Sequence, residues 1–96
     1  MMAAAVPDNP PVSAHAAVRW QERAGLDASN PGTAWLEAQR VDAGAPFQSA
    51  EVRYHHASQT LLLQVGGVID TVYDVHELQD EEYHAVKHAL PQEARR

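Results

Sequence analysis

The stretch from residue 51 to residue 75 places the strongest constraint on the fold. Thr60–Val65 is a strongly apolar run, Val68–Val75 is rich in β-branched residues, and the Gly66-Gly67 pair between them is typical of a tight hairpin turn. Glu51–His56 precedes them and alternates its side chains with a period of two, as a half-buried strand does. These segments predict an antiparallel meander of at least three strands.

The length of the hairpin loop decides which side chains of its second strand face inwards. With a two-residue loop, Asp70 shares a face with Leu61 and Leu63. A three-residue loop brings a different set to that face, namely Ile69, Thr71 and Tyr73. We expect the three-residue loop, because it avoids burying a carboxylate.

Two helices are predicted before the strands. Ala14–Ala24 places apolar and charged residues on opposite arcs, with Ser13 able to cap its start and Gly25 its end. Asn30-Pro31 is a second start signal, because asparagine is a good capping residue and proline suits the first helical position. This second helix is expected to continue to about Asp42.

A third helix is predicted over Glu81–Leu90, with Asp80 able to cap it and Pro91 to stop it. The expected fold class is therefore α+β, with two N-terminal helices packed on an antiparallel meander of three or more strands and a C-terminal helix. The expected organisation is a disordered lead over residues 1–12, a single domain over 13–91 and a C-terminal tail over 92–96.

The composition excludes several kinds of site. The chain has 96 residues, enough for one domain, and no cysteine, so disulfides, thiolate metal sites and a cysteine nucleophile are excluded. Of its 43 apolar residues, 17 are alanine. The core is therefore small, and a homodimer is one way of adding buried surface. With no signal peptide or membrane span in the sequence, we expect a cytoplasmic protein without membrane contacts.

The first predicted helix carries the pattern His15-x-x-x-Arg19-x-x-x-Arg23. A spacing of four places the three side chains along one side of a helix. An imidazole can move a proton near neutral pH, and guanidinium groups can bind the charge that develops on phosphate oxygens. The pattern fits phosphoryl-transfer chemistry without a metal, and it equally fits a solvated helix face.

The segment SAHAAVRWQERAGL resembles the opening helix of a widespread bacterial domain with the pattern H-x-x-x-R-x-x-x-R-x-G, assigned to the barnase–EndoU–colicin–RelE (BECR) nuclease superfamily. Val52-Arg53-Tyr54-His55 is similar to the first strand of such domains, and Asp70-Thr71-Val72-Tyr73 to their last-strand segment "v-T-v-Y". The resemblance covers about residues 13–75. It implies helices followed by a meandering sheet, and a metal-independent endoribonuclease, often a toxin or a mobile-element protein.

The resemblance also implies roles for particular residues. His15 would be the general base or acid, and Arg19 and Arg23 would hold the scissile phosphate. The other implied members of the site are Arg53, His55 and Tyr73 in the catalytic group and Tyr54 and Thr71 as substrate-binding residues. The RNA 2′-OH would attack the adjacent phosphate to give a cyclic phosphate, with no cofactor and no metal. This interpretation predicts that His15, Arg19, Arg53 and Tyr73 converge in one cleft.

The charge distribution favours a different class of function. The formal net charge is −6, whereas proteins that bind nucleic acids usually present a basic surface. The acidic residues between positions 70 and 82 have no lysine or arginine among them: Asp70, Asp74, Glu77, Asp80, Glu81 and Glu82. The alternative hypothesis is a small acidic, non-catalytic interaction protein, such as a phage or mobile-element inhibitor or an antitoxin-like partner. It would bind the basic surface of another protein through Asp74, Glu77, Asp80, Glu81 and Glu82.

The histidines of the second half do not form a recognised metal motif. His84 and His88 are one helical turn apart, a spacing that can hold a metal ion. His55 and His56 point to opposite sides of a strand, and a metal site needs three or four converging ligands. We therefore expect surface histidines and no metal site.

Overall fold

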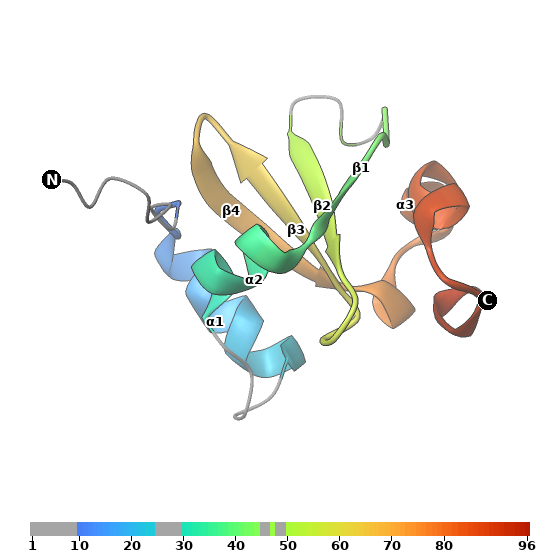
Figure 1. The fold of residues 1–96 in the computed structure, drawn as a ribbon, viewed down its shortest axis with the longest axis horizontal. Helices are drawn as coiled ribbons and strands as arrows, with labels where there is room; N and C mark the ends of the chain where they lie inside the picture. The colour runs from blue at the N-terminus through green and yellow to red at the C-terminus, as the bar shows by residue number, and fades with distance from the viewer. Residues whose placement is uncertain (1–9, 25–29, 45–46, 48–49) are drawn as a thin grey trace, which may run out of the picture.

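The computed structural model describes residues 10–24, 30–44, 47 and 50–96, which form an α+β fold (Figure 1). Two helices, α1 (Ala14–Ala24) and α2 (Pro31–Glu37), precede the strands β1 (Gln39–Val41), β2 (Glu51–His55), β3 (Thr60–Val65) and β4 (Val68–Asp74). Helix α3 (Asp80–Val86) follows, with short 3-10 turns η1 (Val75–Glu77), η2 (Lys87–Ala89) and η3 (Gln92–Ala94). The strands form one antiparallel sheet in the order β1-β2-β3-β4. The predicted α+β class is confirmed.

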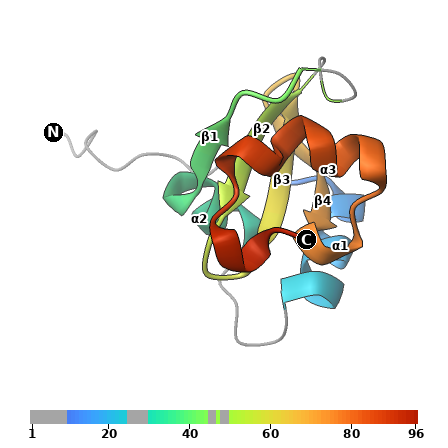
Figure 2. The ribbon, with the colours of Figure 1, turned by 90° about the vertical axis from the view of Figure 1, so that its right-hand side faces the viewer.

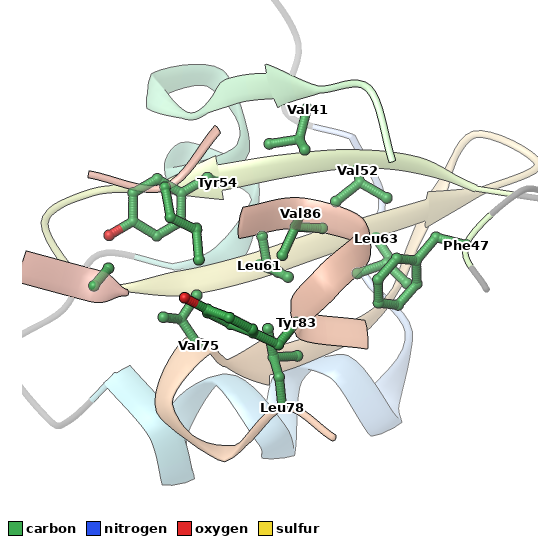
Figure 3. Close-up of a cluster of buried hydrophobic side chains, with 12 residues drawn as sticks. Val41, Phe47, Val52, Tyr54, Leu61, Leu63, Val75, Leu78, Tyr83 and Val86 are labelled. Carbon is green, nitrogen blue, oxygen red and sulfur yellow. The ribbon is translucent and has the colours of Figure 1, made fainter. Parts of the chain in front are cut away.

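Both faces of the sheet are covered, and β3 supplies side chains to each. Leu62 packs against α1 and α2 in a cluster with Ala16, Trp20, Ala34, Trp35, Ile69 and Val72. Leu61 and Leu63 enter a second cluster on the opposite face, which includes Val41, Val52, Tyr54, Val75, Leu78, Tyr83, Val86 and Leu90 (Figure 3). Helix α3 covers this second face and lies in front of the strands in Figure 2. No helix of the described part of the chain is long and apolar enough to cross a membrane.

Helix α2 is shorter than predicted. Asn30 caps it through a bond from the Thr33 N–H to Asn30 Oδ1 (2.9 Å), as expected, but the helix ends at Glu37 and the expected continuation to about Asp42 is wrong. Residues 39–41 instead form β1 and pair with β2. This pairing buries Val41 in the cluster that α3 covers. Strand pairing over these residues outweighs the good helix propensity of glutamine and arginine.

The hairpin between β3 and β4 has the shorter of the two loops considered. Val65 pairs with Val68, so the loop contains only Gly66-Gly67, and the expected three-residue loop is wrong. Both glycines have positive φ angles, 59° and 83°. Such angles suit a two-residue turn and are cheap only for glycine.

A β-bulge at Asp70 compensates for the short loop. Leu63 pairs with Thr71 and the next residue of β3 pairs with Ile69, which leaves Asp70 as the extra residue of β4. Thr71 and Tyr73 therefore lie on the Leu61–Leu63 face, as expected, whereas Ile69 belongs to the cluster under α1. Asp70 is exposed, so the carboxylate stays out of the core.

The C-terminal helix begins and ends earlier than predicted. Gln79, not Asp80, is its N-cap residue, and the Gln79 N–H donates to Glu82 Oε1 (2.9 Å). The α-helix stops at Val86 and continues as the 3-10 turn η2 up to Ala89.

The two ends of the described chain contact the domain. Ser13 N–H donates to the Ile69 carbonyl (3.0 Å), while residues 1–9 of the predicted lead lie outside the described residues. Residues 92–96, assigned to a tail from the sequence, include the buried Ala94. The Arg96 N–H donates to the Tyr83 hydroxyl (2.9 Å), and the Arg96 guanidinium lies 4.7 Å from the centre of the Tyr83 ring.

Replacing Leu62 by alanine tests the central position of β3. Leu62 is fully buried, so L62A should lower the free energy of unfolding by about 2–5 kcal/mol through lost burial and a residual cavity. The matched control L36A changes a leucine that is 43% exposed on α2 and should stay within about 0.5 kcal/mol of the wild type. Urea unfolding followed by circular dichroism measures both; equal losses would contradict this assignment of the core.

Candidate functional site

The predicted site residues of helix α1 have different surroundings: His15 and Arg19 lie on its solvent side, whereas the Nε atom of Arg23 is buried. His15 is exposed and forms no hydrogen bond or ion pair with another described residue. Arg19 pairs with Glu22 one turn further along the same helix, at 3.0 Å. Arg23 reaches past the end of β4 and pairs with Glu77 of η1.

Strand β2 turns Arg53 toward the α1–α2 face. Its Nε donates to Glu51 Oε2 (2.9 Å), and its Nη1 donates to the Trp35 carbonyl (2.9 Å). The guanidinium lies 4.3 Å from the centre of the Trp35 ring. The Trp35 carbonyl also accepts from the Ala38 N–H at 3.3 Å, so Arg53 adds a second bond to it and places a cation at the negative end of α2.

His55 lies two residues further along β2, on the same face, and is held from both sides. Its Nδ1 shares a hydrogen bond of 2.7 Å with the Ser58 hydroxyl, and its Nε2 shares one of 3.0 Å with Glu37 Oε1. The ring is 6% exposed and packs at a tilt against Trp20, with 5.8 Å between centroids. The Glu37 side chain is 59% exposed, so its carboxylate connects the buried imidazole to solvent.

Arg40 belongs to the same face, although the sequence analysis did not select it. It pairs with Arg53 across β1 and β2, and directly paired residues of antiparallel strands share a face. Arg40 and Arg53 are therefore direct neighbours on this face of β1 and β2. The missed signal is the alternation of Gln39-Arg40-Val41, which the predicted helix concealed.

The other predicted residues of the strands occupy the opposite face. Tyr54 and Tyr73 both flank Leu61, whereas Arg53 lies beside Leu62 on the α1–α2 face. The sheet itself therefore separates Arg53 from Tyr73. His15 and Arg19 lie on the solvent side of α1, so the structure does not form the single cleft that the ribonuclease interpretation predicted.

Tyr73 lies near the β4 edge, half-buried against Phe47 with 6.0 Å between ring centroids. Burial and the nearby Glu82 raise the pKa of the Tyr73 hydroxyl above its ordinary value, and Arg23 opposes this rise. Arg23 is therefore near enough to favour the ionised form of Tyr73, although its guanidinium pairs with Glu77. Thr71 donates from Oγ1 to Asp70 Oδ2 at 3.4 Å.

Tyr54 has a buried hydroxyl without a partner. The residue is 4% exposed, and its hydroxyl oxygen forms no hydrogen bond with the described residues. Burial raises the pKa of this hydroxyl above 10.0, and Glu93 adds to the rise. Figure 3 shows the ring at the margin of the core cluster with its hydroxyl turned away from Val52. The ring lines a cavity of about 360 Å³ between β1, β2 and the C-terminal turns.

Several residues of the acidic region form contacts within the molecule. Glu77 pairs with Arg23, Asp80 pairs with Arg96 at 3.0 Å, and Glu82 accepts from the N-cap backbone of α3. Asp74 caps η1 by accepting from the His76 N–H at 2.8 Å. Helix capping and internal pairing therefore explain much of this negative charge. Among the described residues, no group of three His, Asp or Glu side chains is placed to hold a metal ion.

The unpartnered hydroxyl of Tyr54 gives a stability prediction. Y54F should leave the free energy of unfolding unchanged or raise it by about 1 kcal/mol, because a buried hydroxyl without a partner carries a desolvation cost. Y83F is the matched control: it removes a hydroxyl that accepts from the Arg96 N–H, and should cost about 1 kcal/mol. Thermal unfolding of both variants measures these changes. A larger loss of stability in Y54F than in Y83F would contradict the prediction.

The raised pKa values of Tyr54 and Tyr73 predict a loss of stability in alkali. The neutral phenol is favoured in the folded state, so this contribution is complete below the ordinary pKa of 10.0 and is lost as pH rises through the folded pKa. The free energy of unfolding should fall between about pH 9 and about pH 11, with a smaller fall in Y54F. Urea unfolding across this range measures the slope; identical slopes in wild type and Y54F would exclude Tyr54 as a cause.

Comparison with protein families matches residues 12–76 to the family described as "Putative RelE superfamily toxin domain". No curated protein and no solved structure matches the chain. The matched segment spans α1, α2 and the whole sheet, and its extent agrees with the resemblance noted over about residues 13–75. Because the match covers more than half of the chain, this protein belongs to that family of RelE superfamily toxin domains.

Proposed function

We propose that this toxin domain is a metal-independent endoribonuclease of the wider BECR group. The observation that carries the proposal is the placement of Arg40, Arg53 and His55 on one face of β1 and β2, beside the end of α2. Cations that bind phosphate and a group that moves a proton are together sufficient for RNA cleavage by its own 2′-OH.

Arg40 and Arg53 would bind the scissile phosphate. Arg53 uses Nε and Nη1 for Glu51 and Trp35, which leaves Nη2 without a bond to the described residues. Arg40 is exposed directly opposite. Glu51 offsets part of the charge of Arg53, so Arg40 supplies the larger uncompensated attraction for a phosphate.

Glu37 and His55 would handle the proton. The exposed Glu37 carboxylate takes the proton of the 2′-OH, while His55, buried behind it and bonded to Ser58, holds the carboxylate in place. The 2′ oxygen forms a bond to phosphorus, the bond from phosphorus to the 5′ oxygen breaks, and that oxygen takes up a proton from water, while Glu37 returns its own proton to solvent. The products are a 2′,3′-cyclic phosphate and a 5′-hydroxyl end.

The roles predicted for His15, Arg19, Thr71 and Tyr73 stay predictions. These residues lie on the outer side of α1 or on the α3 face, away from the β2 group. His15 and Glu37 are thus two alternative candidates for the general base. The variants H15A and E37Q distinguish them.

Cleavage of a single-stranded RNA oligonucleotide in excess EDTA tests the function. The wild-type chain should produce fragments with 2′,3′-cyclic phosphate ends, identified by mass spectrometry. E37Q should slow cleavage by about 10²–10⁴-fold because a general base is lost. R40A should weaken cleavage and reduce its dependence on salt.

H15A and H84A serve as comparisons, since both change an exposed histidine on a helix. Full activity in both, with loss in E37Q, supports the β2 site. Loss in H15A and normal cleavage by a folded E37Q would move the site to α1. Absence of RNA cleavage by the wild-type chain would overturn the proposed activity.

A further inference from the structure

A chain of hydrogen bonds runs through the ring of His55 and ends at a buried hydroxyl on one side and a carboxylate on the other. Thr60 Oγ1 lies 2.7 Å from Ser58 Oγ, and Ser58 Oγ lies 2.7 Å from His55 Nδ1. The other ring nitrogen, Nε2, lies 3.0 Å from Glu37 Oε1. Serine, histidine and a carboxylate are thus joined in the order that nucleophilic catalysis by serine requires.

The partners fix the direction of each bond in this chain. A carboxylate can only accept, so His55 Nε2 carries the ring proton and donates it to Glu37. In the neutral ring Nδ1 is then an acceptor, and the Ser58 O–H donates to it. The Thr60 O–H donates to a lone pair of Ser58 Oγ. The proton of Ser58 therefore points at a base, which is the arrangement of an activated nucleophile.

The nucleophile and the base differ in exposure as such a pair needs. His55 is buried and its ring packs against Trp20, so water has little access to the base. Ser58 is half-buried in the turn between β2 and β3, where a small molecule can approach it. Thr60 is fully buried at the start of β3 and anchors the Ser58 hydroxyl. The base is shielded while the nucleophile stays near the surface.

The turn also leaves a backbone donor beside the hydroxyl. The Ser58 N–H has no acceptor among the residues that the structure describes. In serine proteases the N–H of the nucleophile itself is one of the donors that bind the oxyanion. Gln59, the next residue, has a positive φ of 55°, a conformation that is uncommon for residues with a side chain and recurs at functional sites.

We propose that Ser58, His55 and Glu37 form a catalytic triad that hydrolyses small carboxylic esters, an activity separate from RNA cleavage. Ser58 Oγ forms a bond to the carbonyl carbon of the ester while its proton moves to His55 Nδ1. The imidazolium then gives this proton to the departing alkoxide, so an alcohol leaves and an acyl-serine remains. Water attacks the acyl group with the same base, which releases a carboxylic acid and restores Ser58.

The same imidazole is thus used from its two sides. In the proposed RNA cleavage, the Glu37 carboxylate takes a proton at the solvent end of the chain. In ester hydrolysis Ser58 gives up a proton at the opposite end, and Glu37 is a positioning residue that stabilises the imidazolium. The two activities share the His55–Glu37 pair and differ in the atom that meets the substrate.

An alkyl fluorophosphonate tests the nucleophile, because an activated serine Oγ bonds to its phosphorus and displaces fluoride. We expect the folded full-length chain to acquire a single phosphonyl group, which peptide mass spectrometry places on Ser58. Ser13 is the internal control, since it is also half-buried but donates to the Asp70 carbonyl at 3.2 Å instead of a base. Absence of an adduct on Ser58, or equally fast labelling of Ser13, would overturn the triad.

Variants test the other two members. H55Q should slow labelling of Ser58 by about 10²–10⁴-fold, because the base is lost. E37Q changes an exposed side chain and should fold normally by circular dichroism, yet slow both labelling and the hydrolysis of p-nitrophenyl acetate. S58A should lose the same hydrolysis. Labelling at the wild-type rate in a folded E37Q chain contradicts the proposed triad.

Nitrogen NMR of the histidine rings gives a readout that a change in stability alone does not alter. At about pH 8 the proton of the His55 ring should lie on Nε2, with Nδ1 showing the shift of a hydrogen-bonded acceptor. A proton on Nδ1 would leave Ser58 without a base and would exclude the triad.

The labelling experiment and the RNA assay have independent outcomes. A Ser58 adduct in a chain that leaves RNA intact keeps the triad and removes the ribonuclease function. RNA cleavage by a chain without a Ser58 adduct keeps the ribonuclease function and removes the triad.

Discussion

The leucines of β3 are the element on which the rest of the structure depends. Leu61 and Leu63 enter the core under α3, and Leu62 enters the core under α1 and α2. A strand with apolar side chains on both faces belongs in the interior of a sheet covered on both sides. Strand β3 thus joins two cores that each contain few large side chains. Each helix is placed where it buries one face of this strand.

The sequence predicted those elements whose signals are local. Ser13 and Asn30 mark helix starts through short-range capping, and both bonds are present, from the Ala16 N–H to Ser13 Oγ at 3.0 Å and from the Thr33 N–H to Asn30 Oδ1. Strand β3 has the predicted bounds, because a glycine pair defines its end. Strand β1 could not be found in this way, since its three residues become a strand only by pairing with β2.

The candidate site required more than local pattern. Arg53 and His55 were selected through the family resemblance, and the period of two in their strand places them on one face, opposite Tyr54. Their partners Trp35, Glu37 and Ser58 come from a helix end and a turn, whose distance from β2 depends on how α2 packs. Arg40 joins them only once β1 exists. The Tyr54 hydroxyl lacks a partner because of how the C-terminal turns pack beside it, and residue spacing does not predict that packing.

Glu37 stands where α2 gives way to β1, at a border of the sheet that no further described strand continues. The strand at this border, β1, is three residues long. The paired arginines, Arg40 and Arg53, lie on one face of the sheet and the cavity lined by Tyr54 on the other, so a single backbone layer separates them. So short a strand is held by few backbone hydrogen bonds, so this border is where the sheet should open first in native-state hydrogen exchange.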